Sequence, residues 1–255
     1  ILDSPAAIAR NAEIVITIVP ADAELKEIVF GPNGLLEAFG RGKVLIEMTT
    51  AMPETVIEVE KAIAGRGGRV LDAPVSGGTT GAANATLTIM AGGMPELLEE
   101  VRPVLETMGK NIIHVGPVGQ GKVVKMVNQL MAAVNLLAMG EAFALGVRCG
   151  ADPKVLYEVI KSSSGYSRMM DARLPGFLFE GKFEPGFKLD LMKKDVNLAL
   201  GSAQALSIPL MFGALASQVF AAASAAGRGA EDFAAAADFL AGAAGVKLDR
   251  AGKTA

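Results

Sequence analysis

The chain has 255 residues, of which 51% are hydrophobic, and its formal net charge is −3 at pH 7. This length and apolar content are enough for two substantial cores, which fits two domains better than one. Acidic and basic residues are interspersed, so no basic face is available to neutralise phosphates and we expect no nucleic-acid partner. The single cysteine, Cys149, cannot form an internal disulfide, and we expect a cytoplasmic protein.

The first 117 residues alternate short apolar runs with stretches of helical period. The runs that read as strands cover residues 14–19, 44–48, 70–73, 86–91 and 112–115. Short apolar strands separated by helices are typical of a parallel sheet covered on both faces. Residues 1–117 are therefore predicted to be an α/β domain, an incomplete doubly wound (Rossmann-like) sheet of the dinucleotide-binding kind.

Residues 118–255 are predicted to be all-helical. Between residues 121 and 147 there is no proline, and the glycines after Gly121 are Gly140 and Gly146, so we expect one long helix that bridges the domains, about 40 Å in length. Further helices are expected at 153–162, 167–179, 188–206, 209–226 and 232–241. No charged residue occurs from 196 to 227, but Pro209 divides this run, so we expect two buried helices and no membrane span.

The first motif that carries chemistry is Asp72-Ala73-Pro74-Val75-Ser76-Gly77-Gly78. A strand ends here in a hydroxyl followed by two glycines. The Ser76 hydroxyl and the N–H groups of Gly77 and Gly78 would form a cradle for a small carboxylate, because donors converge where no side chain blocks approach. A tight turn at the end of a strand explains the same residues equally well.

The second motif covers residues 119–129 and begins the long helix. At helical spacing its polar side chains share one face, and valines and a methionine cover much of the rest. These polar residues are Lys122, Lys125, Asn128 and Gln129. A lysine in this position is either a solvated surface charge or part of a cleft. An ammonium held near a carboxylate cradle can polarise and protonate a carbonyl, so the two motifs together indicate reduction of a small oxo-acid.

These two motifs and a third, Phe187-Lys188-Leu189-Asp190-Leu191-Met192-Lys193-Lys194-Asp195, resemble those of the β-hydroxyacid dehydrogenase family. This family includes 3-hydroxyisobutyrate dehydrogenase, tartronate semialdehyde reductase and glyoxylate reductase. The motifs occur in the family's order, and the resemblance covers nearly the whole chain. It implies an oxidoreductase that transfers a hydride between NAD or NADP and a small 3-hydroxy acid or oxo-acid that carries a carboxylate.

The resemblance also implies roles for individual residues. Lys125 matches the catalytic lysine, Asn128 would orient the substrate or the lysine, and Gln129 would bind the substrate beside it. Ser76, Gly77 and Gly78 would hold the substrate carboxylate. The residues that match cofactor contacts are Val19, Pro20, Thr50, Lys194 and Phe233.

The family's glycine-rich G-x-G-x-x-G turn, which holds the cofactor pyrophosphate at a helix N-terminus, does not occur in this sequence. The resemblance begins at the helix before the family's fourth strand, so we interpret the chain as lacking the first βαβ unit. The residue that selects NAD or NADP belongs to that unit, and the cofactor preference is therefore open.

The Asn128-Gln129 pair and the segment 183–187 resemble the tartronate semialdehyde reductase branch, which makes tartronate semialdehyde the leading substrate. The alternatives are 3-hydroxyisobutyrate or L-serine as substrate. An alternative of another class is a non-catalytic dimerisation module, which the missing glycine-rich turn favours. The imine reductases share the architecture but generally lack this lysine.

No metal site is expected, because the single histidine, His114, reads as a strand end without a second ligand at metal spacing, and Cys149 reads as a small buried residue. The helices after Gly119 carry more apolar surface than one helical layer needs. Family members form dimers or tetramers through their helical domains. We therefore expect a homodimer or homotetramer.

Overall fold

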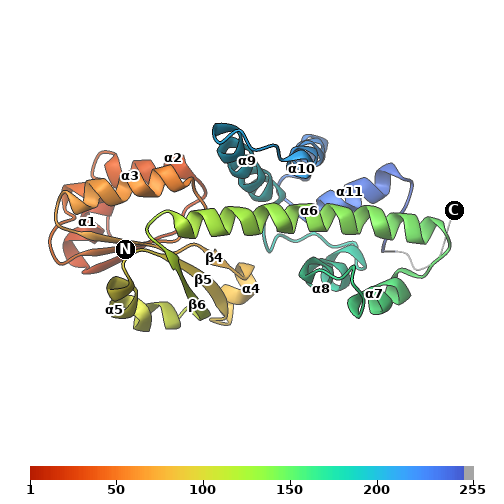
Figure 1. Cartoon of the computed structure of the whole chain (residues 1–255), viewed down its shortest axis with the longest axis horizontal. Coiled ribbons are helices and arrows are strands. Elements are labelled where there is room, and N and C mark those ends of the chain that lie inside the picture. Colours follow the sequence, from red (N-terminus) through yellow and green to blue (C-terminus); the bar gives the residue numbers. More distant parts are fainter. Residues whose placement is uncertain (250–255) are drawn as a thin grey trace. The chain divides into compact units, whose positions relative to one another are not determined.

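A computed structural model describes residues 1–249 (Figure 1). The chain divides into two compact units, the first ending at Val127 and the second beginning at Asn128. This division lies within one long helix, α6 (Gln120–Arg148), ten residues beyond the predicted domain boundary.

The first unit is a six-stranded sheet with helices on both faces. Its strands are β1 (Ile14–Thr17), β2 (Val44–Glu47), β3 (Arg69–Asp72), β4 (Val75–Ser76), β5 (Leu87–Gly92) and β6 (Gly109–Gly116). Its helices before α6 are α1 (Pro5–Asn11), α2 (Asp22–Phe30), α3 (Pro53–Ala64), α4 (Gly78–Ala83) and α5 (Pro95–Glu106), with a 3₁₀ turn at Leu35–Glu37. The five apolar runs predicted as strands all form strands.

Alternation along the strands divides the buried side chains between two cores. Leu45 of β2 packs with Val29 of α2 and Val59 of α3 on one face of the sheet. Ile46, the next residue, packs with Leu98 and Val101 of α5 on the other face. Because both faces are covered, consecutive residues of β2 are apolar from Val44 to Ile46, as the sequence indicated.

The sheet is parallel over β1, β2 and β3, while β5 and β6 run antiparallel to β3. The apolar runs predicted a parallel sheet, so this reversal was not expected. Strand β5 also pairs antiparallel with β4, and the segment between these two strands, residues 77–86, is shorter than the dozen or more residues that a parallel crossover needs. In the same connection Ala85 adopts a φ of 52°, a conformation that favours glycine.

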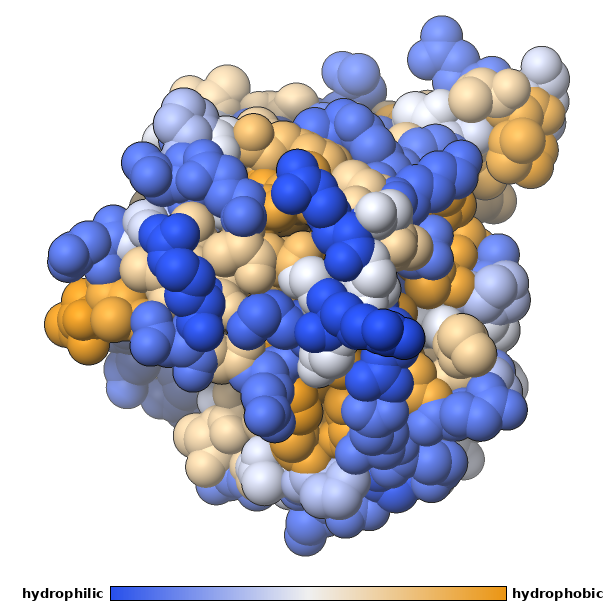
Figure 2. Space-filling view, turned by 90° about the vertical axis from the view of Figure 1, so that its left-hand side faces the viewer, coloured by the Kyte–Doolittle hydropathy of each residue, from blue (hydrophilic) through white to orange (hydrophobic). Residues whose placement is uncertain are grey.

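The surface of the first unit mixes polar and apolar side chains. Strand β1 lies at the edge of the described sheet, paired with β2. Two isoleucines at this edge, Ile16 and Ile18, are 40% and 63% exposed. Figure 2, which faces this end of the molecule, shows apolar residues between polar ones, with neither kind covering the whole face.

The second unit is all-helical. Besides the greater part of α6 it contains α7 (Pro153–Lys161), α8 (Arg168–Arg173), α9 (Leu189–Ala205), α10 (Met211–Ala223) and α11 (Ala235–Ala243). Two π-helical turns, Leu174–Leu178 and Ser224–Arg228, follow α8 and α10. The uncharged run breaks at Ser207, whose φ is 57°, so that α9 and α10 are separate helices as predicted.

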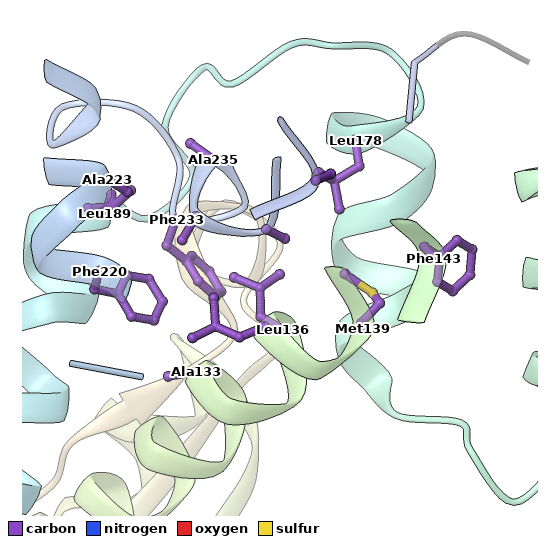
Figure 3. Close-up of a cluster of buried hydrophobic side chains, with 14 of the residues drawn as sticks. Ala133, Leu136, Met139, Phe143, Leu178, Leu189, Phe220, Ala223, Phe233 and Ala235 are labelled. Carbon is purple, nitrogen blue, oxygen red and sulfur yellow. The ribbon is translucent and has the colours of Figure 1, made fainter. Parts of the chain in front are cut away.

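Residues of α6 form the centre of the core of this unit. Figure 3 shows Leu136 of α6, Phe220 of α10 and Phe233 gathered in it, and all three are buried. Among the described residues, α6 is the one helix with the length and hydropathy of a membrane span, and 44% of that window is buried inside the protein. Core helices of soluble domains meet the same criteria.

Candidate active site

The ends of β1 and β2 bring three predicted cofactor residues to one edge of the sheet. Val19 and Pro20 follow β1, and Thr50 follows β2, its parallel neighbour. The N–H of Val19 donates a 3.1 Å hydrogen bond to Oγ1 of Thr49, which ties the two strand ends together. Doubly wound sheets bind dinucleotides at the carboxyl ends of their parallel strands, so Val19, Pro20 and Thr50 lie where a nicotinamide dinucleotide fits.

Ser76, Gly77 and Gly78 form a turn between β4 and α4 whose backbone requires glycine. Gly77 has a φ of 140° and Gly78 a φ of 64°, and both are exposed. A Cβ on Gly77 would lie 3.0 Å from Cδ2 of Leu87. Two successive residues at positive φ are accessible to glycine at little cost, and the absence of side chains lets a ligand approach the backbone closely. The geometry therefore suits the predicted carboxylate cradle.

The start of α6 lies directly against the ends of β3 and β5. Asp72, buried at the end of β3, accepts hydrogen bonds at Oδ2 from the N–H of Gly119 (3.0 Å) and of Lys122 (3.2 Å). A Cβ on Gly121 would lie 2.6 Å from the carbonyl oxygen of Met90. Gly121, in the first turn of α6, is a glycine because no larger residue fits at this approach.

The polar face of this helix is the one that is covered. Lys122 is 1% exposed and Lys125 is 6% exposed, whereas Val124 and Val127 are 37% and 49% exposed. Lys125 is therefore not the solvated surface charge that was its alternative interpretation. Burial of an ammonium is costly unless charged or polar groups compensate it. A lysine that is nevertheless buried often has a catalytic role.

Lys122 forms an ionic cluster that the sequence did not predict. Its Nζ lies 2.5 Å from Oε2 of Glu47 and 2.8 Å from Oδ1 of Asp72. All three side chains are fully buried. Both carboxylates stand at the last residue of an otherwise apolar strand, and such a buried charge needs a partner, which is the signal that could have revealed them.

In the second unit, two predicted site residues meet at a buried aspartate, Asp195 of α9, and a third is bonded to one of them. Nε2 of Gln129 donates a 2.8 Å hydrogen bond to Oδ2 of Asp195, and Nζ of Lys194 lies 3.0 Å from its Oδ1. Nδ2 of Asn128 donates a 3.0 Å bond to Oε1 of Gln129. Asn128, Gln129 and Lys194 therefore belong to one network.

Phe233, the remaining predicted cofactor residue, is 3% exposed and lies in the helical core. Its ring packs edge-on against Phe187 at 6.0 Å, and the Arg173 guanidinium lies 4.5 Å from its centroid. Nε of Arg173 lies 3.0 Å from Oδ1 of the buried Asp232. Burial lowers the pKa of the Arg173 guanidinium from its usual value, and Asp232 opposes this shift. A cofactor contact of Phe233 stays a prediction.

The single histidine and the single cysteine lie at the ends of elements. His114 Nε2 is 2.8 Å from the carbonyl oxygen of Gly93. Cys149 is exposed, so its predicted burial is wrong; it follows the last residue of α6 and lies beyond the core. Within residues 1–249 no group of three or more His, Cys, Asp or Glu side chains could hold a metal ion.

Comparison with known proteins decides the family. Residues 1–116 match a profile described as the NAD binding domain of 6-phosphogluconate dehydrogenase, and residues 119–240 match one described as NAD-binding of NADP-dependent 3-hydroxyisobutyrate dehydrogenase. The chain is 40% identical over 228 residues to 2-(hydroxymethyl)glutarate dehydrogenase of Eubacterium barkeri, covering 89% of this chain and 76% of that relative. The chain belongs to the β-hydroxyacid dehydrogenase family.

Two further relatives agree with this assignment. The 3-hydroxyisobutyrate dehydrogenase of Pseudomonas aeruginosa is 40% identical, with 86% of this chain and 75% of the relative covered. A solved structure of the Mycobacterium tuberculosis 3-hydroxyisobutyrate dehydrogenase with L-serine superposes with a TM-score of 0.83 at 33% identity, covering 92% of this chain and 81% of that chain. As a β-hydroxyacid dehydrogenase, the protein is an NAD(P)-dependent oxidoreductase that acts on small hydroxy acids.

The predicted family, fold class, enzyme class and cofactor are thereby confirmed. The roles of the individual site residues stay predictions, and the structure places them in two groups. The first unit holds Val19, Pro20, Thr50, Ser76, Gly77, Gly78 and Lys125. The second unit holds Asn128, Gln129, Lys194 and Phe233.

Proposed function

We propose that this β-hydroxyacid dehydrogenase interconverts a primary alcohol and an aldehyde on a substrate whose carboxylate is bonded to the neighbouring carbon. The names of its relatives support this class. In 3-hydroxyisobutyrate, 2-(hydroxymethyl)glutarate and L-serine alike, a hydroxymethyl group is bonded to the carbon that carries the carboxylate. Glycerate, the alcohol that corresponds to tartronate semialdehyde, has the same arrangement.

The single observation that carries the proposal is the burial of Lys125, at 6% exposure, on a helix whose first turn is anchored to the strand ends. In the reductive direction the Lys125 ammonium donates a hydrogen bond to the carbonyl oxygen and then transfers a proton to it. When NAD(P)H is bound, its nicotinamide supplies the hydride to the carbonyl carbon. Lys125 is left neutral and regains its proton from solvent.

The other residues of the proposal hold the substrate in place. The hydroxyl of Ser76 and the N–H groups of Gly77 and Gly78 bind the carboxylate, so that the carbonyl two bonds away is fixed in position. Asn128, whose amide both donates and accepts, orients the substrate or Lys125. On the cofactor side, Val19, Pro20 and Thr50 of the first unit would contact the dinucleotide. Lys194, the cofactor residue predicted in the second unit, is held by its ion pair to Asp195.

Within this class we propose tartronate semialdehyde as the preferred oxo-acid. The Asn128-Gln129 pair supports this choice, because it resembles the pair of the tartronate semialdehyde reductase branch. In this chain Gln129 reaches Asp195, and an asparagine at that position is one methylene shorter. The second candidates are 3-hydroxyisobutyrate and L-serine, which the names of the relatives favour.

A substrate panel tests both levels of the proposal. Glycerate, 3-hydroxyisobutyrate, L-serine and 2-(hydroxymethyl)glutarate are oxidised with NAD⁺ or NADP⁺, and the reduced cofactor is followed by absorbance. Lactate, which lacks the hydroxymethyl group, and isobutanol, which lacks the carboxylate, are the controls. We expect turnover of the panel with the highest kcat/KM for glycerate. A higher kcat/KM for 3-hydroxyisobutyrate or L-serine would select that alternative. Equal turnover of lactate would contradict the class, and no turnover at all would favour a non-catalytic module.

A further inference from the structure

The buried cluster of Lys122, Glu47 and Asp72 surrounds the lysine ammonium with oxygen atoms. The ammonium has three N–H groups. It meets three acceptors: Oε2 of Glu47 at 2.5 Å, Oδ1 of Asp72 at 2.8 Å and the carbonyl oxygen of Glu47 at 3.1 Å. Because its side chain is also fully buried, Lys122 has nothing left with which to bind a substrate or cofactor. Its ammonium instead contacts the carboxylates at the ends of β2 and β3.

The same cluster fixes the start of α6. The first N–H groups of a helix have no partner within the helix and need one from outside. Asp72 Oδ2 supplies it for Gly119 and Lys122, at 3.0 and 3.2 Å. The Lys122 side chain then binds the other oxygen of Asp72, so that backbone and side chain of one residue hold one carboxylate.

The cluster continues to the segments predicted to contact the cofactor. Oε1 of Glu47 accepts a 2.8 Å hydrogen bond from the N–H of Thr49, and Oγ1 of Thr49 accepts one from the N–H of Val19 at 3.1 Å. Thr50, predicted to lie at the nicotinamide, is the next residue. One continuous set of bonds therefore joins the ends of β1, β2 and β3 to the first turn of α6.

Close packing removes the remaining freedom of the helix start. A Cβ on Gly121 would lie 2.8 Å from Oδ2 of Asp72, and one on Gly92 would lie 3.0 Å from the N–H nitrogen of Gly121. Lys125 follows Lys122 by one turn on the same helix, about 4.5 Å along the axis. Because a helix is stiff over one turn, a shift or rotation of Lys122 would be carried to Lys125.

We propose that Lys122 is a positioning residue for the reaction: through its ion pairs with Glu47 and Asp72 it sets the placement of the Lys125 ammonium relative to the strand ends. This proposal rests on the proposed role of Lys125 as proton donor. Loss of the Lys122 charge would leave two carboxylates buried without a counter-charge, which forces the helix start to move or the site to admit water. A displacement of about 1 Å costs a reacting group about 100-fold in rate.

A double-mutant cycle tests the proposal in the enzyme. The variants are Lys122→Met, Lys125→Ala and their combination, and the exposed Lys26→Met is the matched control. Lys26 also forms an ion pair, with Glu58 at 2.8 Å, but its side chain is 47% exposed. The readouts are kcat, KM, NAD(P)H affinity by fluorescence titration, and thermal unfolding by circular dichroism.

We expect Lys122→Met to lower kcat about 10- to 100-fold at a temperature where it is folded, with KM and NAD(P)H affinity changed less than about two-fold. In the Lys125→Ala background the same substitution lowers kcat no further, because both act through one group. Lys26→Met leaves kcat unchanged. If Lys122→Met does not fold, Glu47→Asp, which keeps the charge and withdraws the carboxylate by one methylene, replaces it in the same cycle.

Two results would overturn the positioning role. One is an unchanged kcat for a folded cluster variant. The other is an equal fold-loss in the wild-type and Lys125→Ala backgrounds, which would show that the cluster contributes only structure. A Lys125→Ala enzyme with wild-type kcat would instead overturn the proposed function, and with it this inference. The Lys125→Ala variant therefore tests the proposed function, and the Lys122 variants test the positioning role.

Discussion

Gln129 Nε2 donates a 2.8 Å hydrogen bond to Oδ2 of Asp195, a residue 66 positions later in the chain. This bond joins α6 to α9 inside the second unit, where Gln129 is 6% and Asp195 is 1% exposed. The other oxygen of Asp195 lies 3.0 Å from Nζ of Lys194. A residue predicted to bind the substrate and one predicted to bind the cofactor are thus held by the same carboxylate.

Replacing Gln129 by glutamate tests how much the second unit depends on this bond. Gln129→Glu places a second carboxylate against the buried Asp195, and we expect it to lower the free energy of unfolding by more than about 2 kcal/mol. The matched control is Gln218→Glu on the exposed surface of α10, which should change it by less than about 0.5 kcal/mol. Urea unfolding measures both, and equal midpoints for the two variants would refute the coupling.

Ser76→Ala tests the carboxylate cradle. A hydrogen bond to a charged group is worth about 1.5–3 kcal/mol, so we expect KM for the oxo-acid to rise about ten-fold or more. NAD(P)H affinity should stay nearly unchanged, because only a substrate contact is lost. Steady-state kinetics and fluorescence titration measure the two effects, with the neighbouring exposed Thr79→Ala as control. Equal weakening of NAD(P)H binding would assign Ser76 to the cofactor.

Asp171 gives the helical unit a predictable acid response. Its carboxylate accepts hydrogen bonds from the hydroxyls of Tyr157 (2.7 Å) and Tyr166 (2.8 Å). The hydrogen bond from Tyr157 is the main cause that lowers the pKa of Asp171 below its ordinary value of 3.8, and the bond from Tyr166 is the second. A carboxyl whose pKa is lower in the folded state stabilises the protein above the ordinary pKa, and this contribution is lost as the pH falls through the folded-state value.

We therefore expect Asp171→Asn to lower the Tm near neutral pH. The difference from wild type should shrink as the pH is lowered below about 4, where the unfolded-state carboxyl becomes protonated. Thermal unfolding of both proteins as a function of pH measures this. A difference in Tm that stays constant down to about pH 2 would show that the tyrosine bonds do not favour the ionised form.

The exposed side chains around α10 bear on assembly. Large apolar residues there are more than half exposed: Leu206, Ile208, Met211, Phe212 and Leu215. An apolar group of this kind usually marks an interface, and we propose that it lies between subunits of a homodimer or homotetramer. Phe212→Glu should then dissociate the oligomer, whereas Met94→Glu, at a 62% exposed position of the first unit, should not. Light scattering measures the mass, and a monomeric wild type at micromolar concentration would refute the proposal.

Much of the fold was predictable from the sequence because local signals agreed with the tertiary structure. Five of the six strands of the first unit were predicted from apolar runs, and Pro53 and Pro95 stand in the first turns of α3 and α5. The expectation of one helix over 167–179 was wrong. Pro175 has no N–H to donate and blocks a regular continuation, so α8 ends at Arg173 and a π-helical turn follows.

The residues of the candidate site were predictable from the sequence, but the buried carboxylates that hold them in place were not. Helical spacing places Lys122 and Lys125 on the same polar face, and the structure has both lysines on one face of α6. The spacing cannot show that the face points inward, because the partners Glu47 and Asp72 lie 75 and 50 residues earlier in the chain. The bond between Asp195 and Gln129 joins two different helices, which helical periodicity does not report.

The central claim is that Lys125 is the proton donor, and Lys125→Ala tests it most directly. The measurement is kcat for reduction of tartronate semialdehyde, or of whichever panel aldehyde is turned over fastest, with Lys154→Ala on the surface of α7 as control. If Lys125 is the proton donor, kcat falls by a factor of about 10² to 10⁴, the usual contribution of a positioned general acid, and the folded variant still binds NAD(P)H. Retention of more than about a tenth of the wild-type kcat would contradict it.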